Sequence, residues 1–337
     1  MSLTNIGTVK SAVMTAPNQV KAVEREIKSP GRGEVELQVG YVGICGSDLH
    51  AYLGGDTIFD FPIVFGHEFS ARVLRCGPGI DHLPEGQWVG VAPLLACGDC
   101  PFCSAGHEHL CERRAIFGAR TDGALRERLI MPAEVVYPLP AGVSPPEGVL
   151  GEPLAVAIHA VNRAGRDLAG AKVIISGAGA IGLLIALVVE QRGAEQILLL
   201  EIDEKRRNFA RSLGFQITHP EEAPCATADC LFIAAGAPAA IAVIPDLLAP
   251  LGTAVVVGII SEAQLNWFHL LIKEGNVTTS RYFTLSDYQA GIRLLGAPGF
   301  KAKSLIQEQV AFSELFMDEG RQVMGRAQQV MRLLIKI

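Results

Sequence analysis

The chain has 337 residues, and its 29 Lys and Arg against 35 Asp and Glu give a formal net charge of −6. The hydrophobic fraction of 49% supplies ample material for a packed core, which excludes a low-complexity disordered chain. Without clustered cationic charge, neither a nucleic acid nor an anionic membrane is expected as a partner.

The first part of the chain is typical of short β-strands. Residues 8–150 are rich in Gly and Pro, and apolar runs such as Val35–Val42 and Trp88–Ala92 lie between turn signals. Met1–Lys10 has no charged segment followed by an apolar one, so no signal peptide is expected. We therefore expect the protein in the reducing cytoplasm.

From about residue 153 the pattern changes to apolar strands that alternate with helical segments. The expected strands are Lys172–Ser176, Gln196–Glu201, Ala228–Ala234 and Thr253–Gly258, and the expected helices are Ala180–Arg192 and Glu204–Leu213. Such alternation predicts parallel βαβ units in a doubly wound sheet. The uncharged run Val173–Val189 contains three glycines and Ser176, so a strand, a turn and a helix start are favoured over a membrane span. The tail from about residue 286 is expected to pack back onto the first domain.

Four of the eight cysteines crowd into one loop with the spacing C-x2-C-x2-C-x7-C; they are Cys97, Cys100, Cys103 and Cys111. Four thiolates at such spacing can wrap one zinc ion in a closed structural site. Disulfides across two-residue gaps would be strained, and a bacterial iron–sulfur motif needs a nearer fourth cysteine followed by proline. His107 and His109 lie inside the loop and are expected to face solvent.

A second set of residues could hold an open, catalytic zinc. Cys45 lies in the segment Gly43–His50, the pair His67–Glu68 follows, and Glu152 begins the second half of the chain. One thiolate, one imidazole and one or two carboxylates can bind zinc and leave a position for water or substrate. Taken alone this set is weak evidence, because a lone histidine is more often a core residue.

A dinucleotide-binding fingerprint follows the strand Lys172–Ser176 and opens a helix. It is the G-x-G-x-x-G sequence whose cofactor-binding positions are Gly177, Gly179, Ala180, Ile181 and Gly182. Its glycines allow a tight turn and close approach of a pyrophosphate to the helix N-terminus. An acidic residue about 20 positions further on should bind the ribose.

Glu201 ends the next strand and is the expected ribose ligand, with Asp203 as the alternative. Its charge would repel a 2′-phosphate, which favours NAD over NADP. The neighbouring Lys205, Arg206 and Arg207 leave this choice open, since they could reach such a phosphate.

In this order and across nearly the whole chain, these motifs resemble the zinc-dependent medium-chain alcohol dehydrogenases. The resemblance implies an α/β protein with a GroES-like, β-rich catalytic domain interrupted by a Rossmann domain. The implied boundaries are 1–150 and 286–337 for the catalytic domain and 151–285 for the NAD-binding domain. Glu152–Pro153–Leu154 and Arg281–Tyr282 look most like the sorbitol dehydrogenase branch, which acts on polyols, sugars and sugar acids.

The resemblance also implies roles for the second set of ligands. In the family pattern Cys45 and His67 bind the catalytic zinc, and Glu68 is the third ligand in the polyol branch. Glu152 holds the zinc-bound water or moves in as a ligand. Simple alcohol dehydrogenases would carry a cysteine near this position, and threonine dehydrogenases an aspartate.

Four further roles are hypotheses that go with this resemblance. Ser47 is expected to accept the proton of the substrate hydroxyl and to pass it through the cofactor ribose to His50 near solvent, although a turn-capping role is its rival. Asp48 is expected to orient a zinc ligand. Arg281 is implied near the cofactor and substrate, and a surface arginine at a strand end is the alternative.

The sequence thus predicts an oxidoreductase that moves a hydride from a secondary alcohol of a polyol, sugar or sugar acid to NAD. Two zinc ions per chain, one catalytic and one structural, and a homodimer or homotetramer are expected. The alternatives are a simple alcohol or L-threonine dehydrogenase and, from another class, a non-catalytic zinc-loop interaction protein. One departure from the family lies between Thr218 and Asp229, where the crossover helix is expected to be shortened or missing.

Overall fold

The computed structural model describes residues 5–55 and 59–337, so Met1–Thr4 lie outside it. The chain forms two compact units. Unit 1 comprises Met1–Glu152 and Thr284–Ile337, and unit 2 comprises Pro153–Phe283. The predicted fold class is confirmed, with a β-rich unit and a parallel α/β unit.

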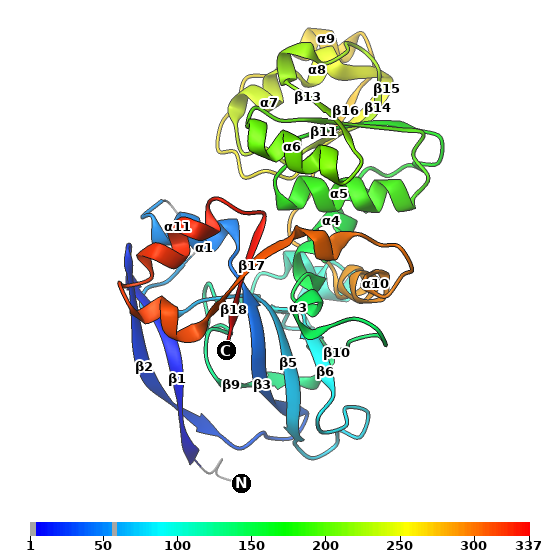
Figure 1. Cartoon of the computed structure of the whole chain (residues 1–337). Helices are drawn as coiled ribbons and strands as arrows, with labels where there is room; N and C mark the ends of the chain where they lie inside the picture. The colour runs from blue at the N-terminus through cyan, green and yellow to red at the C-terminus, as the bar shows by residue number, and fades with distance from the viewer. Residues whose placement is uncertain (1–4, 56–58) are drawn as a thin grey trace. The chain divides into compact units, whose positions relative to one another are not determined.

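Unit 1 is built on β-sheets (Figure 1). A seven-stranded sheet has the order β10-β6-β5-β3-β18-β17, with β9 paired to β3, and a three-stranded sheet has the order β2-β1-β4. The strands are β1 (Asn5–Ala16), β2 (Gln19–Lys28), β3 (Glu34–Gly43), β4 (Ile63–Val64), β5 (Glu68–Cys76), β6 (Trp88–Val91), β7 (Leu94–Leu95), β8 (Ala115–Ile116), β9 (Arg128–Pro132), β10 (Val136–Pro138), β17 (Ile306–Ala311) and β18 (Arg332–Lys336).

Helices and 3-10 turns connect these strands. The α-helices of unit 1 are α1 (Gly46–Tyr52), α2 (Pro101–Ser104), α3 (Pro145–Gly148), α10 (Leu285–Leu295) and α11 (Arg321–Ala327), and α4 (Gly151–Arg163) begins here and continues into unit 2. The 3-10 turns are η1 (Glu108–Leu110), η2 (Ala133–Val135), η4 (Ala302–Leu305) and η5 (Phe312–Phe316). Fully buried Phe65, Phe69 and Leu37 fill the core of this unit.

Three neighbouring strands bring distant residues to one place. In the antiparallel pairing of β3 with β5, Gly43 lies opposite Glu68, and in its pairing with β18 it lies opposite Leu334. A Cβ at Gly43 would lie 2.7 Å from a carboxylate oxygen of Glu68, so only glycine leaves room for that side chain. The end of β3, the start of β5 and the start of β18 therefore meet next to Cys45.

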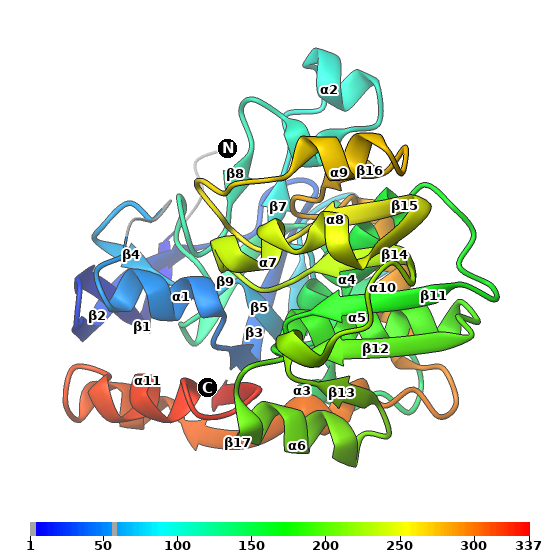
Figure 2. The same ribbon diagram turned by 90° about the horizontal axis from the view of Figure 1, so that it is seen from above.

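Unit 2 is a parallel six-stranded sheet in the order β13-β12-β11-β14-β15-β16. Helices α5 and α6 cover one face, and α7, α8 and α9 cover the other (Figures 1 and 2). Its elements are β11 (Lys172–Ser176), α5 (Ala180–Gln191), β12 (Gln196–Leu200), α6 (Glu204–Ser212), β13 (Gln216–Thr218), η3 (Pro220–Glu222), β14 (Ala228–Ile233), α7 (Pro238–Ala242), α8 (Ile244–Leu247), β15 (Leu248–Val256), α9 (Trp267–Leu271) and β16 (Asn276–Thr279).

The predicted elements of unit 2 agree with the structure to within one residue at each end, except β15, which spans Leu248–Val256 and not Thr253–Gly258. The connection from β13 to β14 holds a single 3-10 turn, η3, so the expected loss of the crossover helix is confirmed. Within the described residues, no helix has both the length and the apolar character needed to span a membrane.

Candidate functional site

The four cysteines of the loop come together as predicted. All of them carry free thiols, and their sulfurs lie within 4.8 Å of one another. Sγ of Cys97 is 3.4 Å from that of Cys111 and 3.9 Å from that of Cys103, which is 3.5 Å from that of Cys100. Sulfurs bound tetrahedrally to one zinc ion at about 2.3 Å would lie about 3.8 Å apart. The loop therefore fits a structural zinc ion.

The two histidines of this loop differ in their surroundings. His107 is exposed, as expected. His109 is only 7% exposed, so its predicted orientation toward solvent was wrong. Its place in the 3-10 turn η1, directly before buried Cys111, turns the imidazole inward.

The second ligand set also assembles in unit 1. Ligand atoms of Cys45, His67 and Glu68 lie within 4.8 Å of one another. Cys45 precedes α1, and its N–H donates a 2.9 Å hydrogen bond to Oδ2 of Asp48 in the first turn of that helix. Oδ1 of the same buried Asp48 lies 3.7 Å from Nδ1 of His67. At this distance the two atoms make no hydrogen bond, so the orienting role expected for Asp48 stays a prediction.

Arg332 belongs to this cluster, and sequence reasoning missed it. The side chain is 3% exposed, and its Nη1 lies 2.9 Å from Oε1 of the equally buried Glu68. The two groups approach without the alignment of a hydrogen bond, so among the described residues neither carboxylate oxygen of Glu68 has a hydrogen-bond partner. A buried carboxylate whose oxygens accept no hydrogen bond, next to a thiol and an imidazole, suits a metal cation even beside the Arg332 guanidinium.

The charges in the cluster favour the same interpretation. Burial raises the pKa of Asp48 to about 6, and burial together with Glu68 raises the pKa of Glu152 to about 7. Burial would lower the pKa of His67, but Asp48 and Cys45 raise it well above its usual value. Carboxyl groups that burial drives toward their neutral forms thus crowd here around Arg332 and His67. A divalent cation would stabilise the charged forms of these carboxyl groups.

The remaining predicted residues of this site lie around the three ligands. Glu152, in the first turn of α4, is buried and feels the charges of Glu68 and His67, but it lies outside the 4.8 Å set. Ser47 and His50 lie three positions apart on α1, which places them on one face of the helix. Ser47 is half-buried and His50 is exposed, so exposure to solvent increases from Ser47 to His50.

The glycine fingerprint adopts the expected turn between β11 and α5. Gly177 has a φ of +99°, and a Cβ on Gly182 would lie 1.9 Å from the carbonyl oxygen of Gly177. Gly179 precedes the first residues of the helix, Ala180 and Ile181, and a Cβ there would meet nothing within 4 Å. The first and last glycines therefore serve the fold, whereas the middle one leaves open the space at the helix N-terminus that a pyrophosphate would take.

Glu201 is held by the backbone around it. Oε2 accepts a 2.9 Å hydrogen bond from Ala178 N–H, and Oε1 accepts bonds from the N–H groups of Ile202 and Asp203. Asp203, the alternative ribose ligand, accepts a bond from Arg206 N–H and caps α6. The carboxylate of Glu201 thus stays next to the fingerprint.

The basic residues beside Glu201 have partners of their own. Nη1 of Arg206 lies 3.9 Å from Oε2 of Glu201. Arg207 donates from Nη1 to the carbonyl oxygens of Glu201 and Ile202. Arg281 is exposed after the last strand of unit 2, and its guanidinium stacks on the ring of Tyr282 at 4.8 Å.

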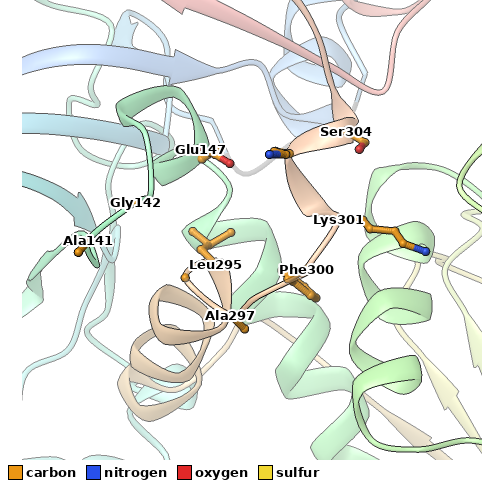
Figure 3. A pocket seen from close by; sticks show the side chains of 11 residues that line it. Ala141, Gly142, Glu147, Leu295, Ala297, Phe300, Lys301 and Ser304 are labelled. Atoms are coloured by element: carbon orange, nitrogen blue, oxygen red, sulfur yellow. The ribbon is translucent and has the colours of Figure 1, made fainter.

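A separate hollow in unit 1 has a volume of about 300 Å³ and is lined in part by Glu147, Phe300, Lys301 and Ser304 (Figure 3). None of the predicted site residues lines it in the described part of the chain. The chemistry is therefore expected at the Cys45 cluster and not in this hollow.

Known proteins match the chain along most of its length. Residues 31–141 match the alcohol dehydrogenase GroES-like domain, and residues 180–297 match the zinc-binding dehydrogenase domain. The 2-dehydro-3-deoxy-L-galactonate 5-dehydrogenase of Pseudoalteromonas atlantica is 36% identical over 296 residues, which cover 84% of this chain and 86% of that protein.

Solved structures agree with this match. The crystal structure of L-idonate 5-dehydrogenase from Escherichia coli superimposes with a TM-score of 0.90 at 27% identity, over 98% of both chains. An Escherichia coli alcohol dehydrogenase complexed with the cofactor NADH superimposes with a TM-score of 0.89 at 26% identity, over 98% of this chain and 100% of that one. The chain therefore belongs to the zinc-dependent medium-chain dehydrogenases of the polyol and sugar branch, and it is an oxidoreductase.

Proposed function

We propose that this enzyme oxidises a secondary alcohol of a sugar acid, with a polyol or sugar as the wider substrate class, and transfers the hydride to NAD. The observation that carries this proposal is the cluster of half-buried Cys45 with buried His67 and Glu68, whose carboxylate oxygens accept no hydrogen bond. The sugar acid is favoured because two similar proteins are named 5-dehydrogenases of 2-dehydro-3-deoxy-L-galactonate and of L-idonate.

Each residue of the cluster has a defined task in this proposal. Cys45, His67 and Glu68 hold the catalytic zinc, and Glu152 orients the water or hydroxyl group beside it or replaces a ligand. Cys97, Cys100, Cys103 and Cys111 hold the structural zinc. When bound, the catalytic zinc would act as a Lewis acid toward the alcohol oxygen, and NAD would accept the hydride.

Proton removal falls to the residues of α1. Ser47 takes the proton of the substrate hydroxyl, and His50 delivers it to solvent, since the first is half-buried and the second is exposed on the same helix face.

NAD, and not NADP, is the proposed cofactor. Gly177, Gly179, Ala180, Ile181 and Gly182 form the proposed pyrophosphate site. The carboxylate of Glu201 would repel a 2′-phosphate, and Arg207 is engaged with backbone carbonyl groups. Arg206 and Arg281 are the proposed contacts from the exposed rim of the cofactor site.

A substrate panel tests the proposed function. We expect the zinc-loaded enzyme to reduce NAD⁺ with L-idonate or L-galactonate at a higher kcat/KM than with polyols, L-threonine or primary alcohols. Metal analysis of the dialysed protein should find about two zinc ions per chain. Reduction of NAD⁺ fastest with L-threonine or a primary alcohol would replace the sugar-acid assignment, and absence of NAD binding would overturn the proposed cofactor.

The same assay with Ser47→Ala tests the relay. The variant should keep its zinc and its affinity for NAD but lose roughly 10²–10⁴-fold in kcat, the usual contribution of a positioned proton-transfer group. Near-normal turnover would leave Ser47 with the turn-capping role alone.

We further propose that a second copy of this chain binds at the β16 edge of unit 2. Among the described strands β16 pairs only with β15, so its other edge is open. The preceding segment exposes Trp267, Phe268 and Leu271 at 67–72%, and Val277 on β16 itself is 36% exposed. A strand edge can pair antiparallel with its own copy across a twofold axis and cover this apolar surface.

The oligomeric state tests that surface. Wild-type protein should sediment as a dimer or tetramer, whereas Val277→Lys should dissociate because a charge would be buried in the strand pairing. Leu53→Lys, which changes an exposed leucine of unit 1, is the matched control and should leave the assembly intact. A variant Val277→Lys that sediments like the wild type would exclude this surface.

The cellular location of the enzyme is also proposed. All eight cysteines are free thiols, a state that reducing compartments maintain. We therefore keep the cytoplasm as the proposed location, with a small molecule as the partner of the catalytic site.

A further inference from the structure

Glu108 joins the cysteine loop to helix α10. Its Oε1 accepts a 2.8 Å hydrogen bond from the backbone N–H of Leu285, a residue 177 positions further along the chain. Leu285 is the first residue of α10, and Thr284 and Asp287 form a capping box beside it. The N–H groups in the first turn of a helix have no partner within the helix, and a carboxylate there also interacts favourably with the helix dipole.

The same glutamate is part of the metal-binding loop. Glu108 begins the 3-10 turn η1 between Cys103 and Cys111, and its carbonyl oxygen accepts a 3.0 Å bond from the N–H of Cys111. The sulfur of buried Cys111 in turn accepts a bond from the N–H of Cys97. The position of the Glu108 carboxylate therefore depends on the closed form of the loop.

Helix α10 in turn packs against the backbone next to Glu152. Tyr288, one turn after Leu285, is fully buried, and a Cβ on Gly151 would lie 2.9 Å from its hydroxyl oxygen and 2.8 Å from Cδ1 of Ile292. Gly151 is a glycine because these two side chains take the space of a Cβ. Any shift of the first turn of α10 would move Tyr288 against Gly151 and would displace Glu152.

We infer that Glu108 is a positioning residue, through which the metal-bound cysteine loop fixes α10 and thereby Glu152. The loop thus has a task beyond its own stability, because loss of its metal would loosen α10 through Glu108. The part of this inference that concerns catalysis rests on the proposed function of Glu152. The mechanical connection from the loop to α10 stands without it.

Hydrogen exchange in the intact chain tests the connection as a double-mutant cycle. Four proteins are compared: wild type, Glu108→Ala, Cys103→Ser and the double variant. Glu108→Ala should speed exchange in the peptide that begins at Leu285 by about tenfold, since a charge-assisted hydrogen bond is lost. Cys103→Ser, or wild type stripped by a chelator, should also speed it, and should add nothing once Glu108 is alanine.

Two further variants separate positioning from general damage. Glu108→Gln keeps an acceptor oxygen for the N–H of Leu285. It should therefore keep most of the wild-type protection of α10 against exchange and most of the wild-type kcat, whereas Glu108→Ala should lose part of both. Glu112→Ala removes an exposed glutamate from the same loop and should leave the exchange of α10 unchanged. If Glu108→Ala folds poorly, Glu108→Gln and the chelator experiment still decide the question.

Equal exchange of α10 in wild type and Glu108→Ala would overturn the connection. So would metal loss that loosens α10 equally with and without Glu108. If exchange responds as expected while the wild type oxidises no sugar acid or polyol, the connection stands and the proposed function fails.

Discussion

Replacing Arg332 by methionine will destabilise the metal-free enzyme by about 3–5 kcal/mol, the usual cost of removing one partner from a buried ion pair. Its guanidinium lies 2.9 Å from Glu68 Oε1, and both side chains are almost completely buried. Methionine fills much of the same volume, so the loss is mainly electrostatic. Urea unfolding of the metal-free and the zinc-loaded protein measures this effect. The cost should be smaller with zinc, because a divalent cation beside Glu68 offsets the lost positive charge.

The double variant Glu68→Met with Arg332→Met is the first control for this prediction. It removes both charges and should recover much of the lost stability, although it should bind less zinc at the catalytic site. Arg326→Met is the matched control, because Arg326 pairs with Glu308 and Glu314 but is 40% exposed. Its cost should stay within about 1 kcal/mol. If Arg332→Met costs no more than Arg326→Met in the metal-free protein, the compensating role of Arg332 is wrong.

Local patterns made most of the fold and the candidate ligands predictable. The strand Lys172–Ser176 and the helix that starts at Ala180 were predicted at their observed starts, because a buried apolar run, glycines and a helix follow one another directly. The cysteine loop is likewise contiguous, so its spacing carries the geometry. The missing crossover helix followed from comparing the few residues between β13 and β14 with the family, which usually has a helix there.

The site features that could not be predicted from the sequence depend on contacts between residues far apart in the chain. Arg332 bonds to the carbonyl oxygen of Ile44, 288 positions away, and an arginine before the apolar run Leu333–Ile335 has no distinctive spacing. Its only signal is a charge at the start of a buried strand. His109 was misplaced for a related reason, because the spacing of cysteines fixes a loop but not which of its other side chains turns inward.

The fingerprint glycines should respond to alanine in opposite ways, and this contrast is the sharpest test of the cofactor site. Gly182→Ala places a Cβ 1.9 Å from the carbonyl oxygen of Gly177, so the start of α5 must shift at a cost of about 1–3 kcal/mol in unfolding free energy. Gly179→Ala meets nothing within 4 Å and should cost only about 0.5–1 kcal/mol, the difference between glycine and alanine before a helix.

Affinity for NADH should nevertheless fall by about tenfold or more in Gly179→Ala, because its methyl group occupies the space through which a pyrophosphate would reach the N–H groups at the start of α5. Fluorescence titration with NADH and thermal unfolding of both variants measure the two effects. Gly214→Ala cannot serve as a control, since its φ of +96° would strain any side chain. Gly325→Ala on α11 of unit 1, where a Cβ meets nothing within 4 Å, is the control. It should lower neither the affinity for NADH nor the thermal stability. Unchanged NADH binding by Gly179→Ala would mean that the cofactor does not approach this helix terminus, and the assignment of the fingerprint would then fail even if the fold stood.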